Sequence, residues 1–175
     1  WNIVELDNTN LDKWIDTSIL SNNIDIAAKS DIIRILLLTS YGGLWVDATL
    51  YCTKPLSKWL NKYITNGFWA FSNPGEDRLI SSWFIYGNEN NSILIKWKDK
   101  VLKYWENRNK KHTYFWFHYL FNELYNENIF VKNTWDSTKH IEAMNSHIFV
   151  PYNSTINYPL TYKIKDYIDK NKTPV

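Results

Sequence analysis

Cysteine and long apolar runs are the scarcest features of this 175-residue chain. Its one cysteine, Cys52, excludes an intramolecular disulfide and suits a reducing compartment. The longest apolar run, at residues 32–38, is interrupted by Arg34 and falls short of the ~18–20 residues that cross a membrane. No basic-then-apolar targeting segment opens the chain. We therefore expect a cytoplasmic protein without a transmembrane segment, associated at most with the inner face of a membrane.

A strong charge of either sign is also missing. The formal net charge is +2, and only three of the 20 basic residues are arginines. Nucleic-acid-binding domains usually carry a marked basic excess on one face. The composition therefore gives no support to a nucleic-acid partner.

Aromatic residues are abundant, at 17% of the chain, with ten tryptophans and twelve tyrosines. Most of these rings are expected to fill the core, and some could stack on a sugar or a nucleobase, because both present flat apolar faces with polar edges. Composition leaves these two roles open. The length fits one domain over residues 1–175.

The hydrophobic spacing predicts an α/β protein. Helices are expected at residues 11–15, 24–41, 56–64, 91–106, 114–127 and 138–144, and strands at 1–6, 44–46, 68–71, 83–86 and 148–150. A turn is expected at residues 72–77, and Asn91 or Ser92 should cap the helix that follows. No internal repeat or linker divides the chain.

The most informative unit is the helix at 24–41 with the strand after it. Gly42-Gly43 can end the helix, and residues 44–46 form an apolar run typical of a central buried strand. Asp47 then stands at the carboxyl end of that strand, where ligands bind in open α/β sheets.

Three polar residues of this unit are candidates for a site. Asp31 and Arg34 lie three residues apart on one helix face, as a local ion pair or as a pair that binds sugar hydroxyls. Asp47 is either a turn residue or a ligand for a hydroxyl or a divalent cation. On a continued strand, Thr49 would point to the same face as Asp47.

These residues sit in a recognisable pattern. Residues 27–34 read Ala-Ala-Lys-Ser-Asp-Ile-Ile-Arg, and residues 42–49 read Gly-Gly-Leu-Trp-Val-Asp-Ala-Thr. The pattern resembles the DXD-containing sugar-transferase superfamily, a GT-A group similar to glycosyltransferase family 32. With residues 51–56 it is most similar to bacterial capsular polysaccharide synthesis glycosyltransferases. The strong resemblance covers about residues 24–60, and residues 81–85 and 114–121 match more loosely.

The resemblance implies a GT-A fold, in which helices flank a mixed, Rossmann-like sheet. It implies retaining transfer from a nucleotide-diphosphate sugar, with a UDP-sugar favoured, to a glycan or lipid-linked acceptor. Asp47 would be the catalytic residue. Together with Asp47, the donor would be bound by Asp31, Arg34, Gly43 and Ser82.

The resemblance also implies Mn²⁺ or Mg²⁺, bound by Asp47 and the second DXD position. That position is Thr49 here, and a hydroxyl is a poorer cation ligand than a carboxylate. The candidates for a compensating ligand are Glu76, Asp77, His118 and Glu123.

Two other functions compete with a transferase. The first is a non-catalytic carbohydrate-binding protein that retains the GT-A fold. It is favoured by Thr49 and by the expectation that residues 1–6 are the second strand of the fold, with the first missing. The second is a glycoside hydrolase, which needs two facing acids where only Asp47 is well placed. Under the transferase hypothesis, Asp47→Asn and Arg34→Ala should each lower turnover at least about tenfold without unfolding the protein.

Overall fold

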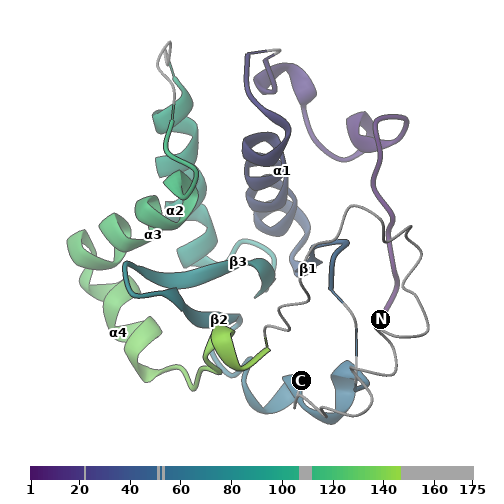
Figure 1. Ribbon diagram of the computed structural model, residues 1–175. Coiled ribbons are helices and arrows are strands. Elements are labelled where there is room, and N and C mark those ends of the chain that lie inside the picture. The colour runs from purple at the N-terminus through teal and green to yellow at the C-terminus, as the bar shows by residue number, and fades with distance from the viewer. Residues whose placement is uncertain (22, 51, 53, 107–111, 147–175) are drawn as a thin grey trace, which may run out of the picture.

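The computed structural model describes residues 1–21, 23–50, 52, 54–106 and 112–146 (Figure 1). Its helices and strands form a mixed α/β structure, as predicted. The helices are α1 (Ile26–Tyr41), α2 (Ser92–Trp105), α3 (Trp116–Glu127) and α4 (Ile129–Ser137). The strands are β1 (Gly43–Val46), β2 (Phe68–Gly75) and β3 (Arg78–Gly87).

The three strands form one sheet in the order β1-β3-β2. Both pairings are antiparallel, with Trp45 opposite Ile85 and Ala70 opposite the same residue. Within the described residues the sheet is therefore not mixed, and no Rossmann-like parallel arrangement is seen. The strand predicted to be central, β1, lies at the edge of this sheet, and its residues are only half-buried or exposed.

The predicted helix and glycine stop are confirmed. The Asp25 carboxylate caps α1 by accepting a hydrogen bond from the Ala28 amide at 2.9 Å. The helix ends at Tyr41, and Gly42 and Gly43 follow with φ values of 64° and 96°. Both φ values lie in the left-handed region that favours glycine, and the chain passes directly from the helix into β1, which pairs with β3.

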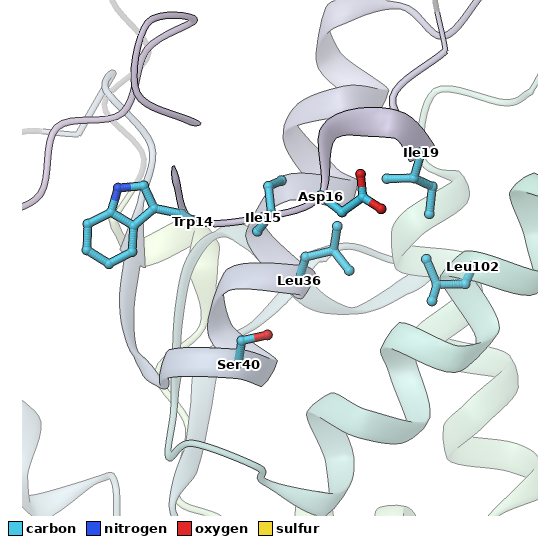
Figure 2. A pocket seen from close by; sticks show the side chains of 7 residues that line it. All are labelled: Trp14, Ile15, Asp16, Ile19, Leu36, Ser40 and Leu102. Carbon is cyan, nitrogen blue, oxygen red and sulfur yellow. The ribbon is translucent and has the colours of Figure 1, made fainter. Parts of the chain in front are cut away.

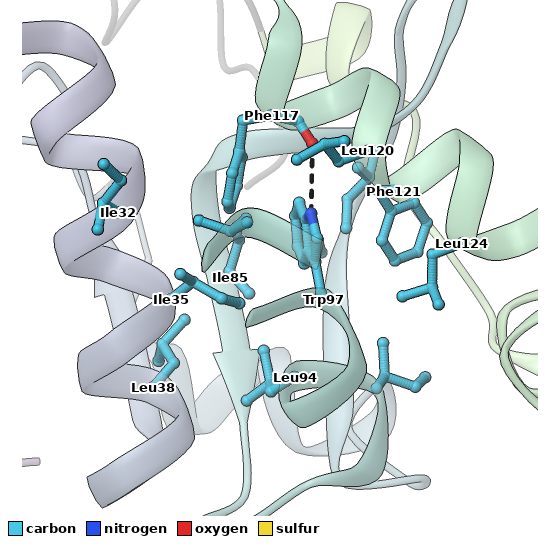
Figure 3. Packing of buried hydrophobic residues seen from close by; sticks show 14 of the residues in the cluster. Ile32, Ile35, Leu38, Ile85, Leu94, Trp97, Phe117, Leu120, Phe121 and Leu124 are labelled. Carbon is cyan, nitrogen blue, oxygen red and sulfur yellow. Dashed lines mark hydrogen bonds between the residues drawn. The ribbon is translucent and has the colours of Figure 1, made fainter. Parts of the chain in front are cut away.

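One face of the sheet is covered by α1, α2 and α3 (Figure 1). Figure 3 shows side chains from these helices meeting around Trp97, whose indole donates to the Phe117 carbonyl at 3.2 Å. The Trp97 and Phe117 rings stack with centroids 4.1 Å apart. These two rings fill the core, the first of the two roles predicted for aromatic residues.

The other face carries a second, mainly aromatic cluster. It consists of Trp59, Leu60, Trp69, Phe71, Phe84 and Ala143. The predicted helix at 56–64 is instead two short 3₁₀ turns, Leu56–Lys58 and Leu60–Lys62. Trp59 separates them with a φ of −139°, outside the helical range, while its ring is packed 5.7 Å from that of Trp69.

Three further predictions need correction. Residues 1–6 form no strand, since Ile3 is 94% exposed and has no sheet face to cover it. The strands β2 and β3 extend through the predicted turn, leaving only Glu76 and Asp77 between them. The helix predicted at 138–144 is wrong. The helix α4 ends before this range, at Ser137, and a 3₁₀ turn begins only at Ala143.

Tertiary contacts explain the last difference. The Trp69 indole donates to the Lys139 carbonyl at 2.9 Å, and the Ser72 amide donates to the Ile141 carbonyl at 3.0 Å. This segment is thereby held against β2 in an extended form. The strand predicted at 148–150 lies outside the described residues.

Candidate functional site

Arg34 is the centre of the candidate site. It lies on the buried face of α1, and only 4% of its side chain is exposed. Its guanidinium forms ion pairs with Asp31 at 3.1 Å and with Asp47 at 3.4 Å. It also donates to the backbone carbonyl of Ser82 on β3. One side chain therefore joins α1, the end of β1 and the centre of β3.

Further contacts fix the orientation of the Arg34 guanidinium. It donates to the Ser30 carbonyl at 3.3 Å and to the Ser30 hydroxyl at 3.1 Å. It also lies 5.1 Å from the centroid of the Trp45 ring and 5.9 Å from that of Phe117. A planar cation held from so many sides has little freedom to reorient.

Asp47 directly follows β1. Its amide donates to the Trp83 carbonyl at 2.9 Å, and its carboxylate accepts a 2.6 Å hydrogen bond from the Trp45 indole. The side chain is 31% exposed, so this carboxylate can still meet a ligand. Thr49 was predicted to point to the same face as Asp47 on a continued strand. The strand does not continue, because it ends at Val46 and a turn begins. Thr49 lies exposed in that turn.

Asp31 is the most buried acid of the group, with 8% of the residue exposed. Burial raises the pKa of its carboxyl to about 7, against the opposing effect of the Arg34 charge, and the nearby Asp47 raises it further. The single Arg34 cation thus faces two carboxylates.

The structure brings Asp31, Arg34, Asp47 and the Ser82 backbone together. Gly43 lies at the other end of β1, opposite Gly87, while the Asp47 end of the strand lies beside Phe84. Two contributors, Ser30 and Trp45, were not predicted as site residues. Both were within reach of simple periodicity, because Ser30 is one helical turn before Arg34 and Trp45 is two strand positions before Asp47.

None of the four compensating ligand candidates forms a hydrogen bond or ion pair with Asp31, Arg34 or Asp47, although the Arg34 charge contributes to the lowered pKa of His118. Glu76 is exposed in the hairpin turn, and Asp77 pairs with Arg78 at 3.2 Å. Glu123 pairs with Lys100 at 3.4 Å, and His118 lies on α3, where burial lowers its pKa to about 4. No cluster of three or more His, Cys, Asp or Glu side chains suited to a metal occurs among the described residues.

A cavity of about 260 Å³ lies elsewhere, between the N-terminal turns and the helices α1 and α2 (Figure 2). Its wall is mostly apolar, with Trp14, Ile15, Ile19, Leu36 and Leu102, and its polar groups come from Asp16 and Ser40. None of the Arg34 group lines it. In the described part of the chain, no helix has the length and apolar character required to span a membrane.

The fold and the Arg34 group define an α/β protein with a buried arginine that links two carboxylates at a sheet edge. Residues 1–170 match the model of the capsular polysaccharide synthesis protein family, so the chain belongs to that family. Its role is therefore in capsular polysaccharide synthesis. No curated protein and no solved structure matches the chain.

Proposed function

We propose that the protein is a glycosyltransferase that moves a sugar from a nucleotide-diphosphate donor, with a UDP-sugar favoured, to a glycan or lipid-linked acceptor in capsule synthesis. The observation that carries the proposal is the convergence of Asp31, Arg34 and Asp47. Asp31 and Arg34 come from α1 and Asp47 follows β1, and the sequence alone makes each of them a candidate. Sequence resemblance and family membership support the same activity.

The chemistry of the group suits a sugar with a phosphate leaving group. Carboxylate oxygens accept hydrogen bonds from sugar hydroxyls, and the guanidinium donates and offsets negative charge. During transfer, the bond between the anomeric carbon and the diphosphate oxygen breaks, and the nucleoside diphosphate leaves. The anomeric carbon bonds to an acceptor hydroxyl oxygen, whose proton passes to the leaving diphosphate or to solvent. A fixed cation near the developing negative charge lowers the barrier without reorganisation.

A divalent cation, Mn²⁺ or Mg²⁺, is part of the proposal. The partly exposed Asp47 carboxylate would hold it. Thr49, the second ligand that the resemblance implies, lies exposed in the turn after β1, and its hydroxyl is a candidate on that resemblance alone. One or two protein oxygens fit a cation that takes its other ligands from phosphate and water. When bound, the cation neutralises charge on the diphosphate.

The test is an incubation of the full chain with a panel of nucleotide sugars and Mn²⁺, in which nucleotide release is followed by mass spectrometry. Asp47→Asn should lower release at least about tenfold while the fold is kept, because Arg34 retains its pair with Asp31. Asp99→Asn, at an exposed carboxylate on α2, is the matched control and should behave like the wild type. Removal of divalent cations with a chelator tests the metal separately.

The alternative function is carbohydrate binding without catalysis, which the Thr49 position favours. It predicts that no donor is hydrolysed, with or without added cation. A release rate that Asp47→Asn leaves unchanged would remove the proposed site even if the protein were an enzyme.

A further inference from the structure

A second polar and aromatic surface lies where the tip of the β2–β3 hairpin meets the start of α3. It is formed by Asp77, Arg78, Tyr114, Phe115 and Tyr119, and we call it the hairpin-tip surface. Its residues come from two chain segments joined by the packing of α3 on β3 (Figure 1).

The polar part of this surface is an exposed carboxylate with both oxygens oriented. Asp77 Oδ1 lies 3.2 Å from Arg78 Nε, and Asp77 Oδ2 accepts a 2.6 Å hydrogen bond from the Tyr119 hydroxyl. The Tyr119 hydroxyl is the main cause of the lowered pKa of Asp77. The Asp77 side chain is still 54% exposed, so it can accept hydrogen bonds from a ligand.

The surface is rigid because a single amide fastens the hairpin to the helix. The Asn122 side chain donates to the Asp77 carbonyl at 2.7 Å and accepts from the Leu79 amide at 3.1 Å. The Arg78 guanidinium lies 3.5 Å from the centroid of the Phe115 ring, which fixes its plane. Binding here would therefore need little ordering of side chains, and ordering is a main cost of binding.

An exposed tyrosine ring contacts Phe115, the ring that packs on Arg78. Tyr114 is 76% exposed, and its ring meets Phe115 edge-on with centroids 4.9 Å apart. An aromatic face next to oriented hydrogen-bonding groups suits a pyranose ring, which has an apolar face and a polar rim. Asp77 and Arg78 offset each other in charge, which favours a neutral, hydroxyl-rich ligand over a free anion.

We propose that the hairpin-tip surface is a saccharide-binding subsite for the acceptor, with stacking on Tyr114 and hydroxyl recognition by Asp77, which Arg78 and Tyr119 orient. This inference rests on the proposed transferase function. Packed rings at the start of α3, ending in the buried Phe117, connect the surface with the candidate donor site. His118 lies 5.6 Å from Phe115 and 6.3 Å from Phe117 between ring centroids, and Phe117 is the ring that lies 5.9 Å from the Arg34 guanidinium.

The first experiment compares transfer with hydrolysis. With the donor that the panel selects, a set of methyl glycosides serves as acceptors, and both glycoside products and free nucleotide are measured. Tyr114→Ala and Asp77→Asn should each lower transfer about tenfold or more while donor hydrolysis stays at the wild-type rate. Tyr125→Phe, at a tyrosine near the end of α3, is the control and should change neither the transfer rate nor the hydrolysis rate. Wild-type transfer by both Tyr114→Ala and Asp77→Asn would overturn the proposal.

The second experiment needs no activity. The same methyl glycosides are titrated into the full chain at high millimolar concentration and followed by NMR. Shifts of the Tyr114 ring and Asp77 amide signals in the wild type, with the Asp77 amide shift lost in Tyr114→Ala, support the subsite. Absence of any shift on this surface with every glycoside overturns it. If no nucleotide sugar is hydrolysed but these shifts occur, the transferase proposal fails while sugar binding at this surface stands.

Discussion

At the scale of single residues, the chemistry of this protein centres on Arg34. Its guanidinium contacts two carboxylates, a backbone carbonyl and a serine hydroxyl, while 4% of the side chain is exposed. Such a residue cannot be removed without consequences for the fold. The expectation that Arg34→Ala would leave the structure intact therefore needs revision.

Arg34→Ala should lower the free energy of unfolding by about 3–5 kcal/mol, because it leaves two carboxylates close together without their cation. The measurement is urea denaturation followed by tryptophan fluorescence. Lys100→Ala is the matched control, since it removes a surface cation that also pairs with two carboxylates, Glu123 and Glu127. The control should cost less than about 1 kcal/mol. Equal effects of the two substitutions would contradict the structural role given to Arg34.

Asp31 should make stability depend on pH. Burial raises its pKa to about 7 in the folded protein from an ordinary value of 3.8, so between these values the folded state binds a proton that the unfolded state has lost. The free energy of unfolding should therefore fall as pH rises through this window. The side chain that Asp31→Asn introduces cannot ionise. The free energy of unfolding of this variant minus that of the wild type should therefore increase from about pH 5 to about pH 8.

The measurement for Asp31 is the difference in unfolding free energy between variant and wild type at the two pH values. Taking this difference removes the contribution of His118, whose lowered pKa acts in the opposite direction below about pH 6.5. Asp99→Asn, whose carboxylate is 65% exposed, is measured alongside as the surface control. A constant difference for Asp31→Asn would show that Asp31 ionises normally in the folded protein.

At the scale of elements, the joint between α1 and β1 positions Asp47. Gly42 and Gly43 both have left-handed φ values, but their surroundings differ. A Cβ at Gly43 would meet no atom within 4 Å, whereas a Cβ at Gly42 would collide with the backbone nitrogen of Glu89. The two positions therefore separate backbone strain from steric collision.

Gly43→Ala should cost about 1–2 kcal/mol, from the left-handed backbone alone. Gly42→Ala should cost more, because the Glu89 backbone must also move. Thermal unfolding of both variants checks the order. If Gly43→Ala were the more destabilising of the two, the backbone geometry assigned to this joint would be wrong.

The elements also separate what local pattern can predict from what it cannot. The helix α2, with Asn91 as its cap, agrees with the prediction because its apolar stripe and cap are both local signals. The segment after α4 does not, since hydrogen bonds from Trp69 and Ser72 hold it against β2. Those partners are about 70 residues away in the chain, and no local pattern reports them.

At the scale of the whole molecule, the sheet separates two clusters of different character. Helices cover one face with a mixed aliphatic and aromatic core, and short turns cover the other with an aromatic cluster. The sheet order β1-β3-β2 brings Ser82, at the centre of β3, within reach of Arg34. The hairpin-tip surface lies at the opposite end of β3 from its pairing with Gly43.

The sequence by itself determined the α/β class, the long first helix and its glycine stop, and Asp31, Arg34 and Asp47 as candidates, because periodicity, capping and charge are local properties. Only the tertiary structure decided that β1 is an edge strand and that one buried guanidinium joins both acids. Strand order and ion pairing depend on which distant segments pack together, and burial sets the protonation of Asp31. Neither is encoded within a short stretch of chain.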